Sequence, residues 1–112
     1  MAPRTVGIIG GMGPDATVDF FRRVVRATPA DADQQHLRIL IDNHPQIPGR
    51  VAAIEGRGPS PVPAMVESAR LLQQAGADFL VIPCHTAHHF VPEVQAQVQI
   101  PILDMVAEVV RW

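Results

Sequence analysis

Short apolar runs alternate along this chain with longer segments in which apolar residues recur at helical spacing. Four runs have the length and composition of buried strands, at residues 5–9, 38–41, 79–82 and 100–105. Helical spacing covers 15–27 and 63–75, and a weaker helical pattern covers 90–98, where Pro92 fits the first turn. Strands that alternate with helices predict parallel pairing through right-handed crossovers. We therefore expect an α/β fold: a single three-layer domain whose four-stranded parallel sheet has the first and third strands at its centre.

The length and composition indicate how many domains to expect and which kinds of partner are excluded. A chain of 112 residues that is 47% hydrophobic has the size of one ordinary domain, so we expect residues 1–112 to form one. The net charge of −2 and the scattered arginines argue against nucleic acid and anionic membranes, which leaves a small-molecule partner. No apolar run approaches the roughly 20 residues of a bilayer span, and residues 1–6 lack the basic region followed by a long apolar run that is typical of a signal peptide, so we expect none. With a single cysteine and therefore no internal disulfide, a cytoplasmic location is expected.

Two segments depart from the alternation. Residues 44–61 are too rich in proline and glycine for a regular element, and loops of this length in compact domains are usually functional or disordered. After the fourth run a helical pattern begins, but the sequence stops at Trp112 after about two turns, too few for a helix to be stable without packing. We expect a chain that ends within a crossover helix.

Polar and special residues follow each predicted strand. Gly10 to Gly13 follow the first, Asp42 to His44 the second, Cys84 to Thr86 the third, and Asp104 closes the fourth. In an open parallel sheet, ligands bind outside the carboxyl ends of the strands. The candidate site therefore lies at this edge.

The glycine-rich turn after the first strand allows two interpretations. Gly11-x-Gly13-x-x-Ala16 matches a dinucleotide-binding fingerprint, and Asp42 stands where a ribose-binding acid could lie. Against this, Pro14 removes an N–H near the helix start and Asp15 places negative charge where a pyrophosphate would bind. A tight strand-to-helix turn explains the glycines without a nucleotide.

Cys84 is the only cysteine, and His85, His88 and His89 follow within five residues. Cysteine and imidazole are zinc ligands, but on a helix the pairs 84/88 and 85/89 point about 100° apart, so no single tetrahedron is evident. Cys84 could instead be a small buried hydrophobe beside histidines that are surface or capping residues. A third interpretation is a reactive thiol, because the N-terminus of a following helix favours the thiolate. Thr86 could then cap that helix or bind a carboxylate, and Arg50 offers a fork for a second one.

Five segments occur in the order and spacing of the aspartate/glutamate racemase family, and the chain resembles that family over essentially its whole length. They are GIIGGMGPDATVDFF, DQQHLRILIDNHPQIPGR, GPSPVP, GADFLVIPCHTAHHF and IPILDM. The resemblance implies cofactor-independent inversion of an acidic amino acid at Cα by two cysteines, one from each of two similar α/β lobes. Pyridoxal phosphate is independently excluded within this chain, because lysine is absent and no Schiff base can form.

The resemblance also assigns residues. Cys84 corresponds to the acid/base thiol of the first lobe, His85 and Thr86 would meet the substrate α-carboxylate, Met12 and Gln46 would line the pocket, and Arg50 would hold the side-chain carboxylate. No metal is implied. A thiolate removes the α-proton from one face while a thiol delivers a proton to the other, and hydrogen-bond donors stabilise the charge that develops on the carboxylate.

Three features differ from the family pattern. His85 replaces the asparagine of PCNTAH, Gly49 replaces the aspartate of IPDR, and no second cysteine motif is present. Two hypotheses follow: the chain is one lobe of a racemase and is inefficient alone, or it is a non-catalytic carboxylate-binding or interaction domain.

A homo-oligomer is also expected. A domain that packs against a second lobe exposes apolar surface when that lobe is absent, and such surface favours self-association.

Overall fold

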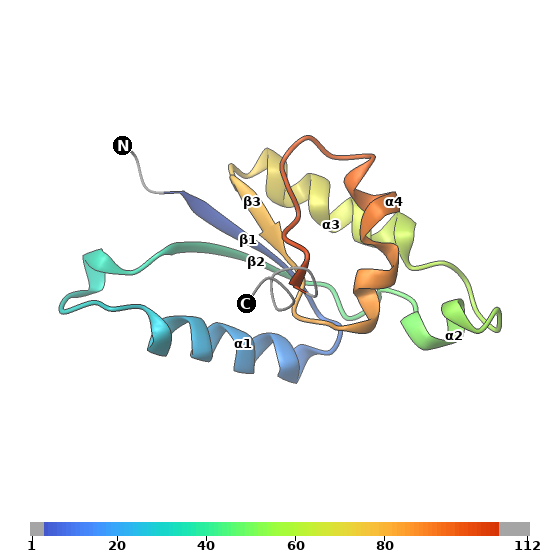
Figure 1. The fold of residues 1–112 in the computed structure, drawn as a ribbon, viewed down its shortest axis with the longest axis horizontal. Coiled ribbons are helices and arrows are strands. Elements are labelled where there is room, and N and C mark those ends of the chain that lie inside the picture. The colour runs from blue at the N-terminus through green and yellow to red at the C-terminus, as the bar shows by residue number, and fades with distance from the viewer. Residues whose placement is uncertain (1–3, 106–112) are drawn as a thin grey trace.

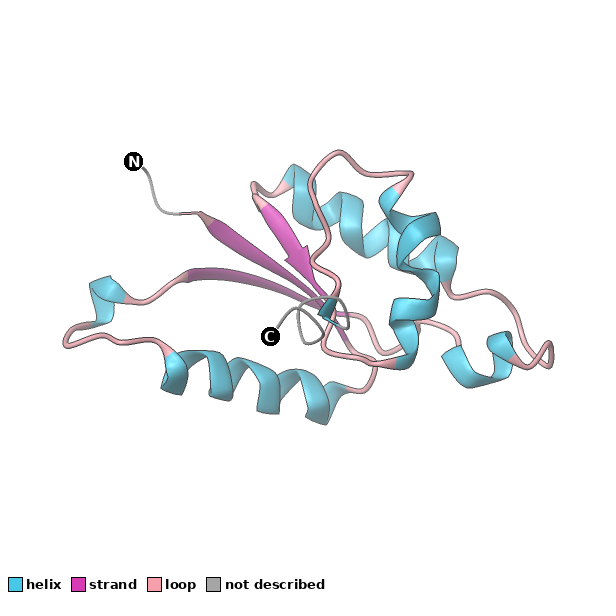
Figure 2. Ribbon diagram, viewed as in Figure 1, coloured by secondary structure: helices cyan, strands magenta, loops and turns pink. Residues whose placement is uncertain are grey.

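A computed structural model describes residues 4–105 and shows a parallel sheet between two layers of helices (Figure 1, Figure 2). The strands are β1 (Thr5–Gly10), β2 (Arg38–Asn43) and β3 (Phe79–Val81); the α-helices are α1 (Pro14–Ala27), α2 (Arg50–Ile54), α3 (Val62–Gln74) and α4 (Val91–Gln95); the 3₁₀ helices are η1 (Asp33–Gln35) and η2 (Thr86–Phe90). α1 lies on one side of the sheet, and α3 and α4 lie on the other. The predicted α/β class and three-layer arrangement are confirmed.

The three named strands are parallel and have the order β2-β1-β3. β1 pairs with β2 from Thr5↔Arg38 to Gly10↔Asn43, and with β3 from Val6↔Phe79 to Ile8↔Val81. Helices cover both faces of β1, which explains its nearly continuous run of buried apolar residues. β2 has a free edge and is correspondingly more exposed.

The predicted fourth strand is wrong. Its only pairing among the described residues is an isolated parallel bridge between Ile102 and Leu80. Pro101 has no N–H to donate, and the Gln95 side chain bonds the Ile102 N–H at 2.7 Å and the Ile100 carbonyl at 3.0 Å. The segment meets β3 through Leu80, whose N–H donates to the Pro101 carbonyl and whose carbonyl accepts from the Leu103 N–H, each at 2.9 Å. Among the described residues the sheet therefore has three strands with one bridge beyond β3.

The helices follow their predictions to different degrees. α1 and α3 begin and end within one residue of the predicted limits, and Gly76, with φ +105°, follows α3 as the expected C′ glycine. The weaker pattern at 90–98 is confirmed in part: α4 covers Val91–Gln95 and carries Pro92 in its first turn, and the 3₁₀ helix η2 precedes it. The prediction that residues 44–61 lack regular structure is wrong at α2. The pattern that begins after the fourth run falls at residues 106–112, outside the described part.

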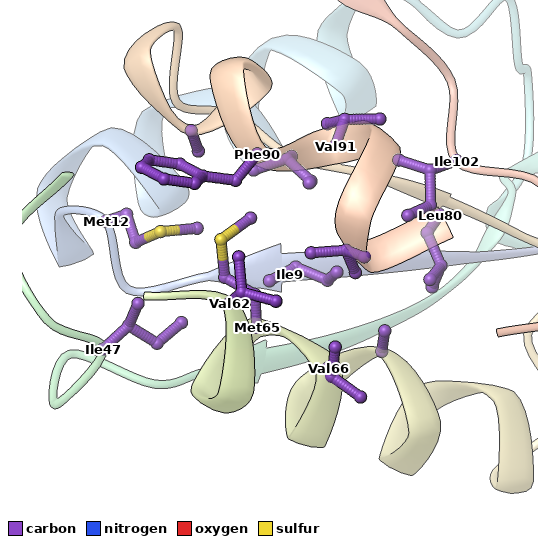
Figure 3. Packing of buried hydrophobic residues seen from close by; sticks show 14 of the residues in the cluster. Ile9, Met12, Ile47, Val62, Met65, Val66, Leu80, Phe90, Val91 and Ile102 are labelled. Atoms are coloured by element: carbon purple, nitrogen blue, oxygen red, sulfur yellow. The ribbon is translucent and has the colours of Figure 1, made fainter. Parts of the chain in front are cut away.

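Most buried apolar side chains lie between the sheet and the α3 side. There, Ile9 of β1 packs with Met65 of α3, Phe90 of η2, and Met12 and Ile47 of the connecting loops (Figure 3). The cluster on the α1 side is small and consists of Val6, Ile8 and Val81, with Phe20 of α1 packed against it. The α3-side cluster thus reaches the loops at the carboxyl ends of the strands. No helix within residues 4–105 has the length and hydropathy needed to cross a bilayer.

Candidate functional site at the carboxyl ends of the strands

The segment after β3 places Cys84 at the sheet edge. Its backbone N–H donates to the Ile82 carbonyl at 2.8 Å, and its thiol lies 3.6 Å from the Thr86 hydroxyl oxygen. The side chain is half-buried and packs against the α3-side cluster. Cys84 is therefore neither a fully buried hydrophobe nor a free surface thiol.

The helix after Cys84 differs from the one predicted. Cys84 stands one residue before His85, the N-cap of η2, and η2 is a five-residue 3₁₀ helix that leads into α4. The His88 N–H donates to the His85 carbonyl at 3.1 Å, and the His88 ring nitrogen Nδ1 bonds the Cys84 carbonyl at 2.8 Å. A five-residue 3₁₀ helix has fewer aligned peptide dipoles than a longer α-helix, so it stabilises a thiolate at its N-terminus less. The ionisation of the Cys84 thiol therefore depends more on the side chains next to it.

A cavity of about 360 Å³ opens beside η2. Its walls come from α2, η2 and the segment that follows the isolated bridge: Ile54, His85, Thr86, His88, His89 and Asp104. Thr86 connects the cavity with the thiol, because its hydroxyl contacts Cys84 and its side chain lines the wall. The volume falls at the lower end of the range for small-molecule sites.

The structure brings Cys84, His85 and Thr86 together and places the other predicted residues apart from the cavity wall. Arg50 begins α2, and its Nη1 donates to the carbonyls of Ile47 and Pro48 at 3.3 and 3.2 Å. Its Nε is buried and has no partner within residues 4–105. Gln46 is exposed on the same loop.

Met12 lies in the core. Its side chain is 4% exposed and packs with Phe90 and Ile47 (Figure 3). It thus supports η2 from beneath and has almost no surface of its own for a ligand. The sequence prediction had Met12 lining a substrate pocket.

Close packing explains Gly10 and Gly11 of the β1–α1 turn, whereas a Cβ at Gly13 would meet nothing within 4 Å. Gly11 has φ +99°, and a Cβ there would lie 2.4 Å from the His44 carbonyl carbon. The Gly11 N–H donates to the Thr17 hydroxyl at 2.9 Å, and that hydroxyl in turn donates to the Gly13 carbonyl at 3.2 Å. A side chain of α1 thus occupies part of the turn where a phosphate would need donors. This geometry supports the tight-turn interpretation over nucleotide binding.

One wall residue and one hydrogen bond of the site were not predicted from the sequence. Ile54 reaches the cavity because α2 forms within the segment that was expected to be irregular. His44 bonds the fully buried Ser68 of α3 through Nδ1 at 3.1 Å, which attaches the end of β2 to the α3 side. Among residues 4–105, no three histidine, cysteine or acidic side chains are grouped as metal ligands would be.

Comparisons with known proteins agree on one family. Residues 9–111 match the family model described as Asp/Glu/Hydantoin racemase. The chain is 29% identical over 112 residues to the broad specificity amino-acid racemase RacX of Bacillus subtilis, a match that covers 95% of this chain and 48% of the relative. The chain thus spans about half the length of this curated relative.

Solved structures of a racemase and of a racemase homologue also superpose on this chain. The aspartate racemase of Picrophilus torridus superposes with a TM-score of 0.84 at 38% identity, over 92% of this chain and 44% of that one. An aspartate racemase homologue from Pyrococcus horikoshii superposes with a TM-score of 0.77 at 22% identity, over 96% of this chain and 47% of the other. This second likeness concerns the fold alone.

Proposed function

The chain belongs to the Asp/Glu/hydantoin racemase family, and on that premise we propose that it forms one lobe of an amino-acid racemase in which Cys84 transfers the α-proton. The observation that supports this most directly is the contact of the half-buried thiol with Thr86 at the edge of the cavity. The substrate we propose is an acidic amino acid, in keeping with the name of the Picrophilus torridus relative. No cofactor is required in this proposal.

The proposed chemistry uses few groups. The Cys84 thiolate removes the proton from Cα, which leaves negative charge delocalised onto the α-carboxylate. The Thr86 hydroxyl and the His85 imidazole, which both line the cavity, would donate hydrogen bonds to that carboxylate. Inversion needs a second acid on the opposite face of Cα. Because Cys84 is the only cysteine of this sequence, we propose that a second lobe or a second copy supplies it.

We propose that Arg50 binds the side-chain carboxylate of the substrate and that Gln46 lines the pocket beside it. Arg50 Nη1 is bonded to two backbone carbonyls, and its buried Nε has no partner within the described chain. A charged carboxylate is a stronger acceptor for guanidinium than a peptide carbonyl, so a bound dicarboxylic acid would draw this group away from Ile47 and Pro48. Met12 would support η2 rather than contact the ligand.

Isotope exchange tests the role of Cys84. L-Aspartate or L-glutamate is incubated with the chain in deuterium oxide, and deuterium at Cα is followed by mass spectrometry while chirality is followed by chromatography. A single working base exchanges the proton even where net inversion is slow. We expect exchange that is abolished by Cys84→Ala, with racemisation slower than exchange. No exchange with either amino acid, or exchange that persists in the variant, would contradict the proposal.

Arg50→Ala tests the binding mode, with Arg57→Ala as the matched control. Arg57 is an exposed arginine of the same connection and pairs with Glu55 at 2.9 Å. We expect Arg50→Ala to weaken the binding of aspartate more than that of alanine, by roughly tenfold, because a charge-assisted bond is lost only with the dicarboxylic acid. Isothermal calorimetry measures both ligands. Equal losses for the two ligands would assign Arg50 a structural role in the loop.

Self-association stays a prediction. Val18 and Phe21 of α1 and Ile41 of β2 are exposed around a cavity of about 250 Å³, and exposed apolar patches favour association. Sedimentation equilibrium at micromolar concentration measures the oligomeric state. A monomer throughout that range would make the prediction wrong.

A further inference from the structure

His88 is bonded to the backbone of the proposed acid/base residue rather than to its side chain. Its Nδ1 lies 2.8 Å from the Cys84 carbonyl oxygen. A carbonyl oxygen can only accept a hydrogen bond, so Nδ1 carries the hydrogen in this arrangement. The bond therefore selects one tautomer of the neutral ring, with the lone pair on Nε2.

The bond from His88 is the second of two hydrogen bonds that hold the Cys84 backbone in place. The Cys84 N–H is already held by the Ile82 carbonyl at 2.8 Å. With its carbonyl held by His88, both polar backbone groups of Cys84 have partners, one from β3's end and one from η2. The direction of the Cα–Cβ bond, and with it the path of the thiol toward the Thr86 hydroxyl, follows from this fixed backbone.

The His88 ring is enclosed on its far side. Nε2 is buried and has no hydrogen-bond partner within residues 4–105, although the side chain lines part of the cavity wall. An enclosed ring cannot turn over freely, and a flipped ring would lose the bond to Cys84. The neighbouring His89 differs: it is exposed, and its ring lies edge-on to Phe90 at 4.9 Å. The two adjacent imidazoles are therefore not interchangeable.

From these contacts we infer that His88 is a positioning residue for Cys84, which holds the cysteine carbonyl through Nδ1–H and so fixes where the thiol points. This inference rests on the proposed role of Cys84, but the geometry it describes can be measured without turnover. Small misplacements of a reacting group can reduce a rate by about 10²-fold. The expected role in catalysis is thus indirect, through the position of the sulfur.

The first test uses the unmodified chain. Long-range ¹H–¹⁵N NMR spectra distinguish the two neutral histidine tautomers by their ring nitrogen shifts. We expect His88 to show hydrogen on Nδ1. Hydrogen on Nε2, or averaging between the two tautomers, would overturn the inference even if every variant failed to fold.

The second test compares His88→Asn, His88→Phe and the control His36→Asn. The asparagine amide nitrogen occupies the position of Nδ1 on Cγ and can keep the bond, whereas phenylalanine keeps the ring and loses the donor. His36 is exposed and lies in the segment before β2. Because Cys84 is the only thiol, iodoacetamide reports on this residue alone.

We expect His88→Phe to increase the alkylation rate about fivefold, the factor that one ordinary hydrogen bond contributes, because the half-buried thiol segment opens more often. His88→Asn and His36→Asn should stay within about twofold of the original chain. Equal rates in both His88 variants would overturn the inference. Deuterium exchange at Cα should fall at least tenfold in His88→Phe and recover in His88→Asn. Alkylation that follows this order without any exchange in the original chain would retain the positioning role and reject the proposed activity.

Discussion

The two faces of the sheet differ in how completely they are packed. On the α3 side, Met65, Ala69 and Leu80 are fully or almost fully buried, and the cluster continues to Ile102 at the isolated bridge. On the α1 side, Val18 is 57% exposed and Phe21 is 40% exposed, although α1 is strongly amphipathic. The same sheet thus supports one nearly complete core and one partial core.

The two faces differ because successive side chains of β1 point to opposite sides of the sheet. Gly7 and Ile9 face α3, while Val6 and Ile8 face α1. Glycine at position 7 lets α3 and the segment before β3 approach closely. The residues that support the candidate site, Met12 and Phe90 among them, belong to the α3 side. We conclude that apolar packing around the site comes mainly from the α3 side, while α1 contributes the Thr17 hydrogen bonds to the β1–α1 turn.

The largest expected effect is that of Met65→Ala on the α3 side. Met65 is fully buried in the cluster of Figure 3, and removal of such a side chain costs about 2–5 kcal/mol of unfolding free energy. Met65→Leu, which keeps the volume, should cost less than about 1.5 kcal/mol. Urea unfolding followed by circular dichroism measures both. A loss in Met65→Ala no larger than that in Met65→Leu would contradict the comparison between the faces.

The next effect concerns overpacking on the same face. A Cβ at Gly7 would lie 2.7 Å from Leu80 Cδ2 and 2.9 Å from Ala77 Cβ, so Gly7→Ala should destabilise the fold by about 1–3 kcal/mol. In the double variant Gly7→Ala/Leu80→Ala, the trimmed leucine removes the closer of these two contacts, while the one with Ala77 remains. We expect the double variant to lose less stability than the sum of the single variants. If the losses of the two single variants simply added up in the double variant, the new methyl group would not collide with Leu80, and the α3 side would be less tightly packed than these distances indicate.

Much of the fold could be predicted from the sequence because the strongest patterns are local. The runs at β1 and β3 and the periodicity of α3 reflect burial of a strand or of one helix face. β2 and α1 have the same kinds of pattern, although their apolar residues are only partly covered. The fourth run was predicted as a strand from its apolar residues, but among the described residues it pairs with β3 only at the Leu80↔Ile102 bridge, and the Gln95 side chain bonds the Ile100 carbonyl and the Ile102 N–H. α2 was missed because the proline and glycine residues around it gave a stronger signal than its five residues.

The candidate site was predicted less completely. Cys84, His85 and Thr86 are consecutive in sequence, so the end of one strand was sufficient to place them together. The directions of Met12 and Arg50 depend on loop packing and on backbone carbonyls of the same loop, which no periodicity encodes. His88 was considered as a metal ligand or as a surface or capping residue, and the sequence did not indicate which backbone group its ring would bond.

A smaller effect is expected on the α1 side. Phe20 is half-buried against Val6, Ile8 and Val81. Because part of its surface already lies in water, Phe20→Ala should cost about 1 kcal/mol, clearly less than the 3–5 typical of a fully buried phenylalanine. The same urea titration measures it. A loss as large as that of Met65→Ala would mean that the two faces contribute equally to stability.

The smallest expected effect is that of Val18→Ser. Val18 is 57% exposed on α1, and valine and serine have similar helix propensities, so the free energy of unfolding should change by less than about 0.5 kcal/mol. If the exposed side chain is instead covered by association in solution, the substitution removes contacts that only the assembly makes. The melting temperature of the original chain would then rise with protein concentration, while that of Val18→Ser would not. Calorimetry at several concentrations separates the two cases. A large loss in Val18→Ser without any concentration dependence would show that α1 is packed within the monomer, and the contrast between the two faces would have to be abandoned.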